Sequence, residues 1–234
     1  SVYVDIDSDG LKITGRLLYT GNVKYPSTWY SPGIMGWYSF VPFMECKHAV
    51  VSVSHRIDGR LDINGTSIDF SGGKGYIEKD WGKSFPESWI WLQSNHFSHS
   101  DACIMISIAR IPWLGSFFVG FLGFFYYDGT FYPFSTYLNS EITRLQRDEQ
   151  KLFIEVRGKD HTLQVIAGIS QSGLLRAPKS GEMSRHIKES IDSELEVSLT
   201  SRKGALVYKD HAARAGLEVI DSIFDIVKIK PGSR

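Results

Sequence analysis

The segment Gly73–Gly82 reads Gly-Lys-Gly-Tyr-Ile-Glu-Lys-Asp-Trp-Gly and places a phenol and two carboxyl groups at alternate positions. In a β-strand, alternate side chains point to the same face, so Tyr76, Glu78 and Asp80 would share one face. If that face is buried, lost solvation and the neighbouring like charge raise the pKa of at least one acid. A carboxylic acid that stays protonated near neutral pH can act as a general acid. The segment therefore predicts an acid catalyst; the alternative is a strand whose polar face lies in solvent.

A second group of side chains that could bind or exchange protons lies in residues 89–96. Alternation along a strand gives Trp89, Trp91 and Asn95 one face and His96 the other. Indole rings attract cations through their π faces, and imidazole exchanges protons near neutral pH. A lone histidine is more often structural than catalytic, so both roles stay open for His96.

Glu45 and His48 form a third candidate pair. They lie three residues apart, so a regular strand would place them on opposite faces. Each is either a hydrogen-bonded structural group, a surface residue or a member of a site.

Several other motifs only imitate known sites. Trp81-Gly82-Lys83-Ser84 resembles the end of a phosphate-binding loop, but Ile77 stands where that loop needs glycine. Gly73-Lys74-Gly75 has Glu78 at the third glycine position of a dinucleotide fingerprint. His96-Phe97-Ser98-His99 has no supporting cysteine or carboxylate cluster in the sequence, so we expect no metal site. The chain also has no Gly-x-Ser-x-Gly elbow for a hydrolase nucleophile.

The composition is that of an ordinary globular protein. The 234 residues include 26 Lys and Arg and 26 Asp and Glu, and 42% of residues are hydrophobic. Disordered chains lack so much apolar surface, and a nucleic-acid binder would carry a basic excess for the phosphates. The two cysteines, Cys46 and Cys103, cannot form a disulfide framework. With no signal segment at the start, we expect a cytoplasmic protein that binds no nucleic acid.

Short strands separated by turn residues dominate the sequence, which is typical of an all-β sandwich or barrel. We expect helix only in residues 182–191 and 221–227. The polar, Pro-containing bend at residues 82–87 predicts a boundary between a first domain, 1–87, and a second domain, 88–234. The second block has enough strands to close a small barrel around one ligand.

Residues 111–127 form an unusual stretch of 17 residues without a charge. A membrane-spanning helix needs about 20 apolar residues, and three glycines interrupt this stretch. As a strand it would be apolar on both faces. The stretch is therefore either part of a hairpin packed in the protein core or a surface that contacts lipid.

Longer strings of residues resemble one known family, the tocopherol cyclase-like proteins. These strings are residues 31–46 (SPGIMGWYSFVPFMEC), 75–86 (GYIEKDWGKSFP), 91–97 (WLQSNHF), 109–115 (ARIPWLG) and 173–178 (GLLRAP). The resemblance extends over most of the chain and is specific, because the strings are long. More distantly, the family is similar to carotenoid hydratases, whose aromatic–x–acid–x–x–Trp motif falls here on Tyr76, Glu78 and Trp81.

The resemblance implies two lipocalin-like β-barrels of antiparallel strands with a minor C-terminal helix. Family members usually carry about 80 to 100 further residues upstream, including a Glu-Gly-Trp-Tyr-type stretch. We therefore expect this chain to begin inside the first barrel, which would be incomplete. The transit peptide of the plant enzymes is missing too, which fits a bacterial cytoplasmic relative.

The family implies a cyclase that needs no cofactor. It protonates an alkene in the prenyl tail of a quinol, and the quinol hydroxyl captures the tertiary cation to form a chromanol. We expect Glu78 as the general acid, Asp80 as the charged neighbour that raises its pKa, Tyr76 as its hydrogen-bond partner, and His48 as a base for the phenol. The residues expected to contact the substrate are Trp37, Glu45, Trp81, Trp89, Trp91, Asn95 and His96.

Two other functions use the same residues. A hydratase or isomerase of an isoprenoid lipid would use the same acid, and a hydratase would admit water. A non-catalytic lipocalin-like carrier would need a greasy cavity and no acid. The expected partner in each case is a hydrophobic small molecule, with peripheral membrane contact and the oligomeric state left open.

Overall fold

The computed structural model describes residues 1–229, whose regular secondary structure is almost entirely antiparallel β-strand. The chain forms two compact units. Unit 1 comprises Ser1–Pro26 and Ala49–Lys79, and unit 2 comprises residues 27–48 and the chain from Asp80 onward. The expected domain boundary at residue 87 stays a prediction.

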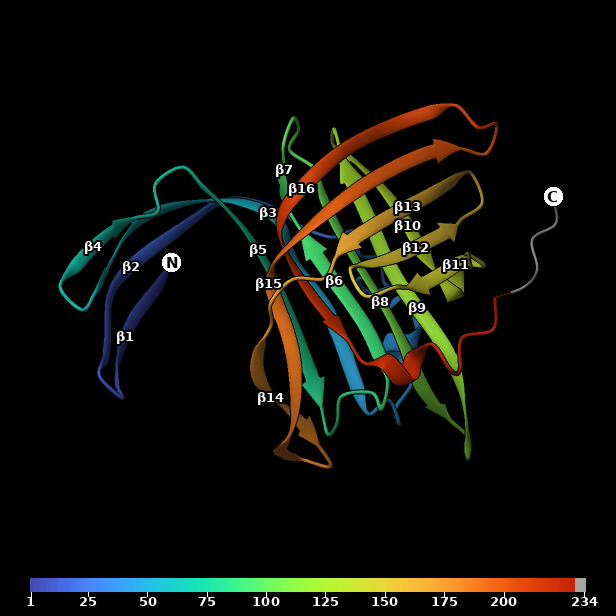
Figure 1. Cartoon of the computed structure of the whole chain (residues 1–234), viewed down its shortest axis with the longest axis horizontal. Helices are drawn as coiled ribbons and strands as arrows, with labels where there is room; N and C mark the ends of the chain where they lie inside the picture. Colours follow the sequence, from blue (N-terminus) through green and yellow to red (C-terminus); the bar gives the residue numbers. More distant parts are fainter. Residues whose placement is uncertain (230–234) are drawn as a thin grey trace. The chain divides into compact units, whose positions relative to one another are not determined.

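Unit 1 contains most of one five-stranded sheet (Figure 1). Its strands are β1 (Val2–Ser8), β2 (Leu11–Val23), β3 (Cys46–Ile63), β4 (Thr66–Asp69) and β5 (Gly73–Gly82). They follow the order β1-β2-β3-β4, and β5 also pairs with β3. The turns Asp9-Gly10 and Asn64-Gly65 have positive φ at both residues, as two-residue hairpins between twisted strands require. Both β3 and β5 run on into unit 2, so each strand can carry side chains of both units.

Unit 2 is built on an eleven-stranded sheet with the order β10-β9-β8-β6-β16-β15-β13-β12-β11, in which β14 pairs with β15 and β7 with β16. The strands are β6 (Trp89–Ser94), β7 (His96–Phe97), β8 (Cys103–Trp113), β9 (Ser116–Tyr127), β10 (Thr130–Ser135), β11 (Glu141–Arg147), β12 (Lys151–Arg157), β13 (His161–Gly168), β14 (Gly173–Lys179), β15 (Glu182–Ser201) and β16 (Leu206–Val219). Consecutive strands pair antiparallel, as in a lipocalin-like meander. In the ladders between residues 1 and 229, β10 and β11 are the two ends of this path.

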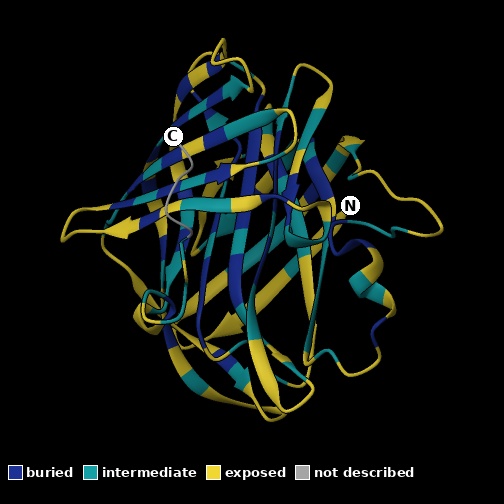
Figure 2. Cartoon of the chain, turned by 90° about the vertical axis from the view of Figure 1, so that its right-hand side faces the viewer, coloured by how far each residue is buried: buried dark blue, intermediate teal, exposed yellow. Residues whose placement is uncertain are grey.

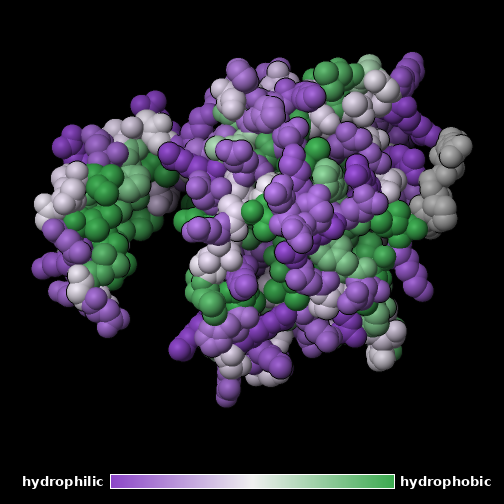
Figure 3. Space-filling model, viewed as in Figure 1, coloured by the Kyte–Doolittle hydropathy of each residue, from purple (hydrophilic) through white to green (hydrophobic). Residues whose placement is uncertain are grey.

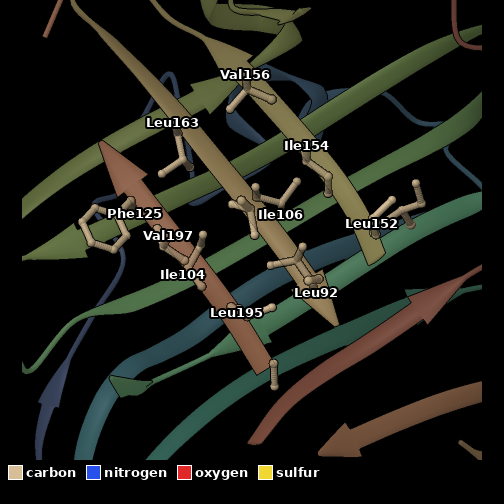
Figure 4. Close-up of a cluster of buried hydrophobic side chains, with 14 of the residues drawn as sticks. Leu92, Ile104, Ile106, Phe125, Leu152, Ile154, Val156, Leu163, Leu195 and Val197 are labelled. Carbon is tan, nitrogen blue, oxygen red and sulfur yellow. The ribbon is translucent and has the colours of Figure 1, made fainter. Parts of the chain in front are cut away.

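The core of unit 2 follows from period-two alternation in these strands. Buried and exposed residues alternate along them (Figure 2), because successive side chains point to opposite faces. Ile104, Ile106 and Ile108 of β8 are at most 1% exposed. Figure 4 shows the cluster they join, which includes Leu92, Ile104, Ile106, Phe125, Leu152, Ile154, Val156, Leu163, Leu195 and Val197. Burying one such side chain contributes about 1.5–3 kcal/mol, so this face holds the sheet together.

The outer surface is mixed in character. On the face drawn in Figure 3, hydrophobic residues of unit 2 are interspersed among hydrophilic ones. Both cysteines are free, Cys103 in the buried interior and Cys46 partly buried. None of the helices in residues 1–229 has the length and apolar character needed to cross a membrane.

The expected helix at residues 182–191 is wrong, because this stretch is the first half of β15. Met183, Ile187 and Ile191 recur at every fourth position and so imitate a helical stripe. Only Ile187 is buried, at 4% exposure, whereas Met183 and Ile191 are 56% and 75% exposed. Antiparallel pairing with β14 and β16 overrides the local pattern.

The expected C-terminal helix is reduced to a single turn. Asp221–Ile223 forms a 3-10 turn rather than an α-helix. Residues 1–229 contain two other 3-10 segments, Gly36–Phe40 and Thr136–Leu138, and no α-helix.

Candidate functional site

The phenol and the first carboxylate of the predicted acid strand are hydrogen-bonded to each other. In β5, the Tyr76 hydroxyl donates to Oε2 of Glu78 at 2.6 Å, and both side chains are half-buried. They are two residues apart on one strand, so regular alternation alone brings them together. This length is within the ordinary range for an O–H···O hydrogen bond, so Oε2 can accept from Tyr76 while Oε1 carries a proton. The pair can therefore hold a proton in a defined place.

Asp80, the next residue on the same face of β5, is bound to His48 of β3. Nδ1 of His48 lies 2.7 Å from Oδ1 of Asp80, and the two side chains are 12% and 30% exposed. A carboxylate at Nδ1 fixes the imidazole orientation and tautomer and stabilises its protonated form. This arrangement can accept a proton, which is the role expected for His48. The expected role of Asp80 as a neighbour that raises the pKa of Glu78 stays a prediction.

Cys46 is a neighbour of this pair that sequence reasoning missed. Its Sγ lies 4.0 Å from Oδ1 of Asp80. Burial, and secondarily the charge of Asp80, raise the pKa of the Cys46 thiol to about 12. The thiol therefore stays protonated at neutral pH and is not a nucleophile. Cys46 and His48 are alternate residues of one strand and therefore share a face, and this spacing could have identified Cys46 from the sequence.

Unit 2 by itself offers a metal ion only a weak set of donors at this place. His48 and Asp80 supply an imidazole nitrogen and a carboxylate oxygen, but these two atoms are hydrogen-bonded to each other. Structural zinc sites use four ligands and catalytic ones three. Our expectation that the protein uses neither a metal nor a cofactor stays a prediction.

Trp89 and Trp91 lie on the face of β6 opposite Ile90 and Leu92, which belong to the main core, and Trp89 contacts two charged residues that sequence reasoning missed. Trp89 is 4% exposed, and its Nε1 donates to Oε2 of Glu218 at 2.5 Å. The Arg185 guanidinium lies 4.7 Å from the centroid of a Trp89 ring. Trp91 stands opposite Glu218 in the β6–β16 register. One face of Trp89 is thus already occupied by a protein cation and is closed to a cationic substrate.

Trp37 and Trp81 are far more exposed than the other two tryptophans, at 47% and 46%. Trp37 packs against Tyr38 with a centroid distance of 4.2 Å and an interplanar angle of 34°. Trp81 follows Asp80 in β5 and points to the opposite face of that strand. That these four tryptophans contact the substrate stays a prediction.

The remaining predicted contacts differ in their surroundings. Asn95 is 5% exposed between β6 and β7, and within residues 1–229 its Nδ2 has no hydrogen-bond partner. His96 is half-buried in β7, opposite Ala213. Glu45 is exposed just before β3, and its carbonyl oxygen accepts from the Lys83 amide at 2.8 Å. Of these three, Asn95 has the unsatisfied group that a ligand could pair with.

A second histidine–carboxylate pair lies elsewhere in unit 2. Nδ1 of His99 is 2.8 Å from Oδ1 of Asp210, whose side chain is 3% exposed, and the backbone amides of His99 and His211 also donate to this carboxylate. Burial favours the neutral acid, but the hydrogen bonds and the charge of His99 outweigh it and lower the pKa of Asp210 to about 2. The His99 side chain is 83% exposed. We interpret the pair as an anchor that ties the segment after β7 to β16.

We expect Asp210→Asn to lower the free energy of unfolding by about 2 kcal/mol at pH 7, because the folded pKa lies about two units below the usual 3.8. This stabilisation is present above the unfolded-state pKa and is lost as the pH falls from about 4 to about 2. Chemical denaturation between pH 7 and pH 2 measures it. Asp192→Asn, an exposed position on β15, is the control. An equal loss at both positions would contradict the anchor role.

Two plant proteins are similar to part of this chain. It is 28% identical over 150 residues to the probable chloroplastic tocopherol cyclase of Oryza sativa subsp. japonica, an alignment that covers 61% of this chain and 31% of the rice protein. It is 30% identical over 74 residues to the chloroplastic tocopherol cyclase of Zea mays, covering 32% of this chain and 16% of the maize protein. The chain thus aligns with less than a third of the length of either relative.

The fold has a counterpart among solved structures. Kievitone hydratase from Nectria haematococca superposes with a TM-score of 0.50 at 12% identity, over 92% of this chain and 70% of that one. At this identity, the likeness shows the fold alone. The model of the tocopherol cyclase-like family matches residues 20–220, which is most of the sequence. The chain therefore belongs to the tocopherol cyclase-like family.

Proposed function

We propose that this protein is a cofactor-independent cyclase that closes a chromanol ring on a prenylated quinol by protonating an alkene. The observation that carries the proposal is the 2.6 Å hydrogen bond between Tyr76 and Glu78 on a half-buried strand. Family membership supports the reaction type, since the relatives it matches are tocopherol cyclases. A carrier of a hydrophobic ligand has no need for a paired phenol and carboxyl group on this strand.

In the proposed reaction, Glu78 transfers its proton to the less substituted alkene carbon of the prenyl tail. The electron pair of the double bond forms the new C–H bond, and a tertiary cation remains. The quinol oxygen attacks this cation and forms the C–O bond of the ring. Its phenolic proton passes to His48, whose charge is stabilised by Asp80 at 2.7 Å. One proton enters and one leaves, so no oxidant or reductant is needed.

Tyr76 has a role in the step after Glu78 has given up its proton. After the transfer, Glu78 is a carboxylate, and the Tyr76 hydroxyl is placed to donate to it. This bond stabilises the ionised form and so favours proton release to the alkene. Tyr76 is therefore a positioning residue, and a proton from solvent resets Glu78 for the next cycle.

Incubation of the purified protein with prenyl quinols and other isoprenoids, followed by chromatography and mass spectrometry, tests the proposal. A cyclised product has the mass of its substrate and a new retention time. In deuterium oxide it gains one deuterium at the protonated carbon. A product heavier by one water would identify a hydratase. Binding without any product would favour the carrier, and buffer at the same pH measures the uncatalysed background.

A further inference from the structure

Two charge-free segments of unit 2 meet at its surface. Residues 27–44 and 111–127 contain no Asp, Glu, Lys or Arg, although 22% of the whole chain is charged. Phe43 of the first segment lies 5.3 Å from Trp113 of the second, between ring centroids. Tyr38 likewise stacks on Phe118 at 6.1 Å. We call the set Trp37, Tyr38, Phe43, Trp113, Leu114 and Phe118 the aromatic patch.

Three residues of the aromatic patch are open to solvent, and Tyr38, Trp113 and Phe118 are half-buried. Trp37 is 47% exposed, Phe43 52% and Leu114 81%. Singly exposed apolar residues are normal, but a contiguous exposed set marks an interaction surface. Ring contacts continue through the patch, from Trp113 to Phe118 at 5.9 Å and from Trp37 to Tyr38 at 4.2 Å. Its residues therefore form one surface, with parts supplied by two distant stretches of sequence.

Leu114 at the tip of this surface has an unfavourable backbone conformation. It sits with Gly115 in the two-residue turn between β8 and β9, where its φ is +46°. The other non-glycine residues with positive φ in residues 1–229 are polar: Asp9, Asn64, Asp128, Asn139, Ser180 and Arg214. A leucine in the left-handed region is sterically disfavoured, and asparagine would fit the turn better. The turn thus accepts strain to present an apolar side chain to solvent, which points to a function for that side chain.

The residues around the patch favour a lipid surface as its partner. The Arg110 guanidinium lies 4.1 Å from the ring centroid of Phe117, and Lys47 Nζ donates to the carbonyl of Ser39 at 3.0 Å. Arg and Lys with long apolar stems at the border, and Trp and Tyr beside a protruding Leu, are typical of interfacial membrane anchors. Arg110 is also paired with Glu87, so attraction to anionic lipid adds little.

We propose that the aromatic patch inserts into one leaflet of a phospholipid bilayer, with Leu114 as its deepest side chain. The patch carries no charge of its own, so binding is driven by apolar burial. It therefore requires neither anionic lipid nor low salt. The proposal stands independently of the proposed reaction, since it concerns adsorption of the whole protein and not turnover.

Flotation of the full chain with phosphatidylcholine vesicles tests this surface. We expect the protein to float with the vesicles at low and at high salt. Leu114→Asn should weaken partition about tenfold, because it removes a large apolar side chain from the contact. Asparagine tolerates the left-handed conformation, so this variant should unfold at the same temperature as the wild type or higher. Loss of vesicle binding can then not be attributed to misfolding.

Leu206→Asn is the matched control. Leu206 is 63% exposed at the start of β16, next to the β15–β16 turn and away from the β8–β9 tip (Figure 1). We expect this variant to float like the wild type. Failure of the wild type to float, or an equal loss in the control, would overturn the proposal. So would a loss of self-association in Leu114→Asn without any change in vesicle binding, which would identify the patch as a contact between two copies.

Discussion

Replacing Glu78 with Gln should lower turnover of a prenyl quinol by about 10³- to 10⁴-fold and leave substrate binding nearly unchanged. General acid catalysis contributes about 10²- to 10⁴-fold. The loss should lie near the upper end of this range, because an alkene is a weak base and water does not readily replace Glu78 as its proton donor. The amide keeps the size of the acid and can still accept from Tyr76, but it has no acidic proton. Steady-state kinetics and equilibrium binding of the quinol, measured on the same preparations, separate the two effects.

Two further variants test whether the loss belongs to Glu78 itself. Glu155 of β12 is also half-buried and also accepts a hydroxyl hydrogen bond, from Thr143. Glu155→Gln should therefore retain full activity. Tyr76→Phe should reduce kcat far less than Glu78→Gln, because it removes a positioning contact and not the proton. If Glu78→Gln retains activity, Glu78 is not the proton donor and the proposed mechanism is wrong.

Replacing His48 with Asn should lower turnover about 10²-fold, the low end of the range for proton transfer by a positioned side chain. The phenol would then have to lose its proton to solvent as the ring closes. Asp80→Asn should have a smaller effect on the maximal rate and should move the active pH range downward. The reason is that a protonated imidazole loses the carboxylate that stabilises it at 2.7 Å. Rate profiles from pH 5 to pH 9 measure both changes.

His99→Asn is a close control for His48→Asn. His99 also binds a carboxylate through Nδ1, at 2.8 Å, but lies in the segment anchored to β16. The His99→Asn variant should be less stable than the wild type but should keep the same dependence of rate on pH.

If Asp80→Asn abolishes turnover while Glu78→Gln spares it, the acid is Asp80 and the roles of Asp80 and Glu78 are reversed.

The strand content and the family could be predicted from the sequence because both depend on local patterns. Period-two alternation and turn residues predicted an all-β fold, and the family resemblance implied antiparallel strands; the structure and its solved counterpart confirm both. The helix predicted at residues 182–191 was wrong, because this stretch is part of β15. There, pairing with two neighbouring strands decided the outcome.

The candidate site shows the same division between local and distant contacts. The Tyr76–Glu78 bond joins alternate residues of one strand, so the sequence was sufficient to place them together. The bonds from Asp80 to His48 and from Trp89 to Glu218 join residues 32 and 129 positions apart. Strand pairing sets such contacts, and a one-residue change of register would turn each side chain to the other face.

The sequence by itself thus determined the strand alternation, the family and the shared face of Tyr76, Glu78 and Asp80 on one strand. Only the tertiary structure decided that Asp80 binds a histidine, that Arg185 covers a face of Trp89, and that two uncharged segments join in one exposed patch. The physical reason is that alternation is a property of the backbone of a single strand. Partners from distant strands depend on how the whole sheet buries its apolar face.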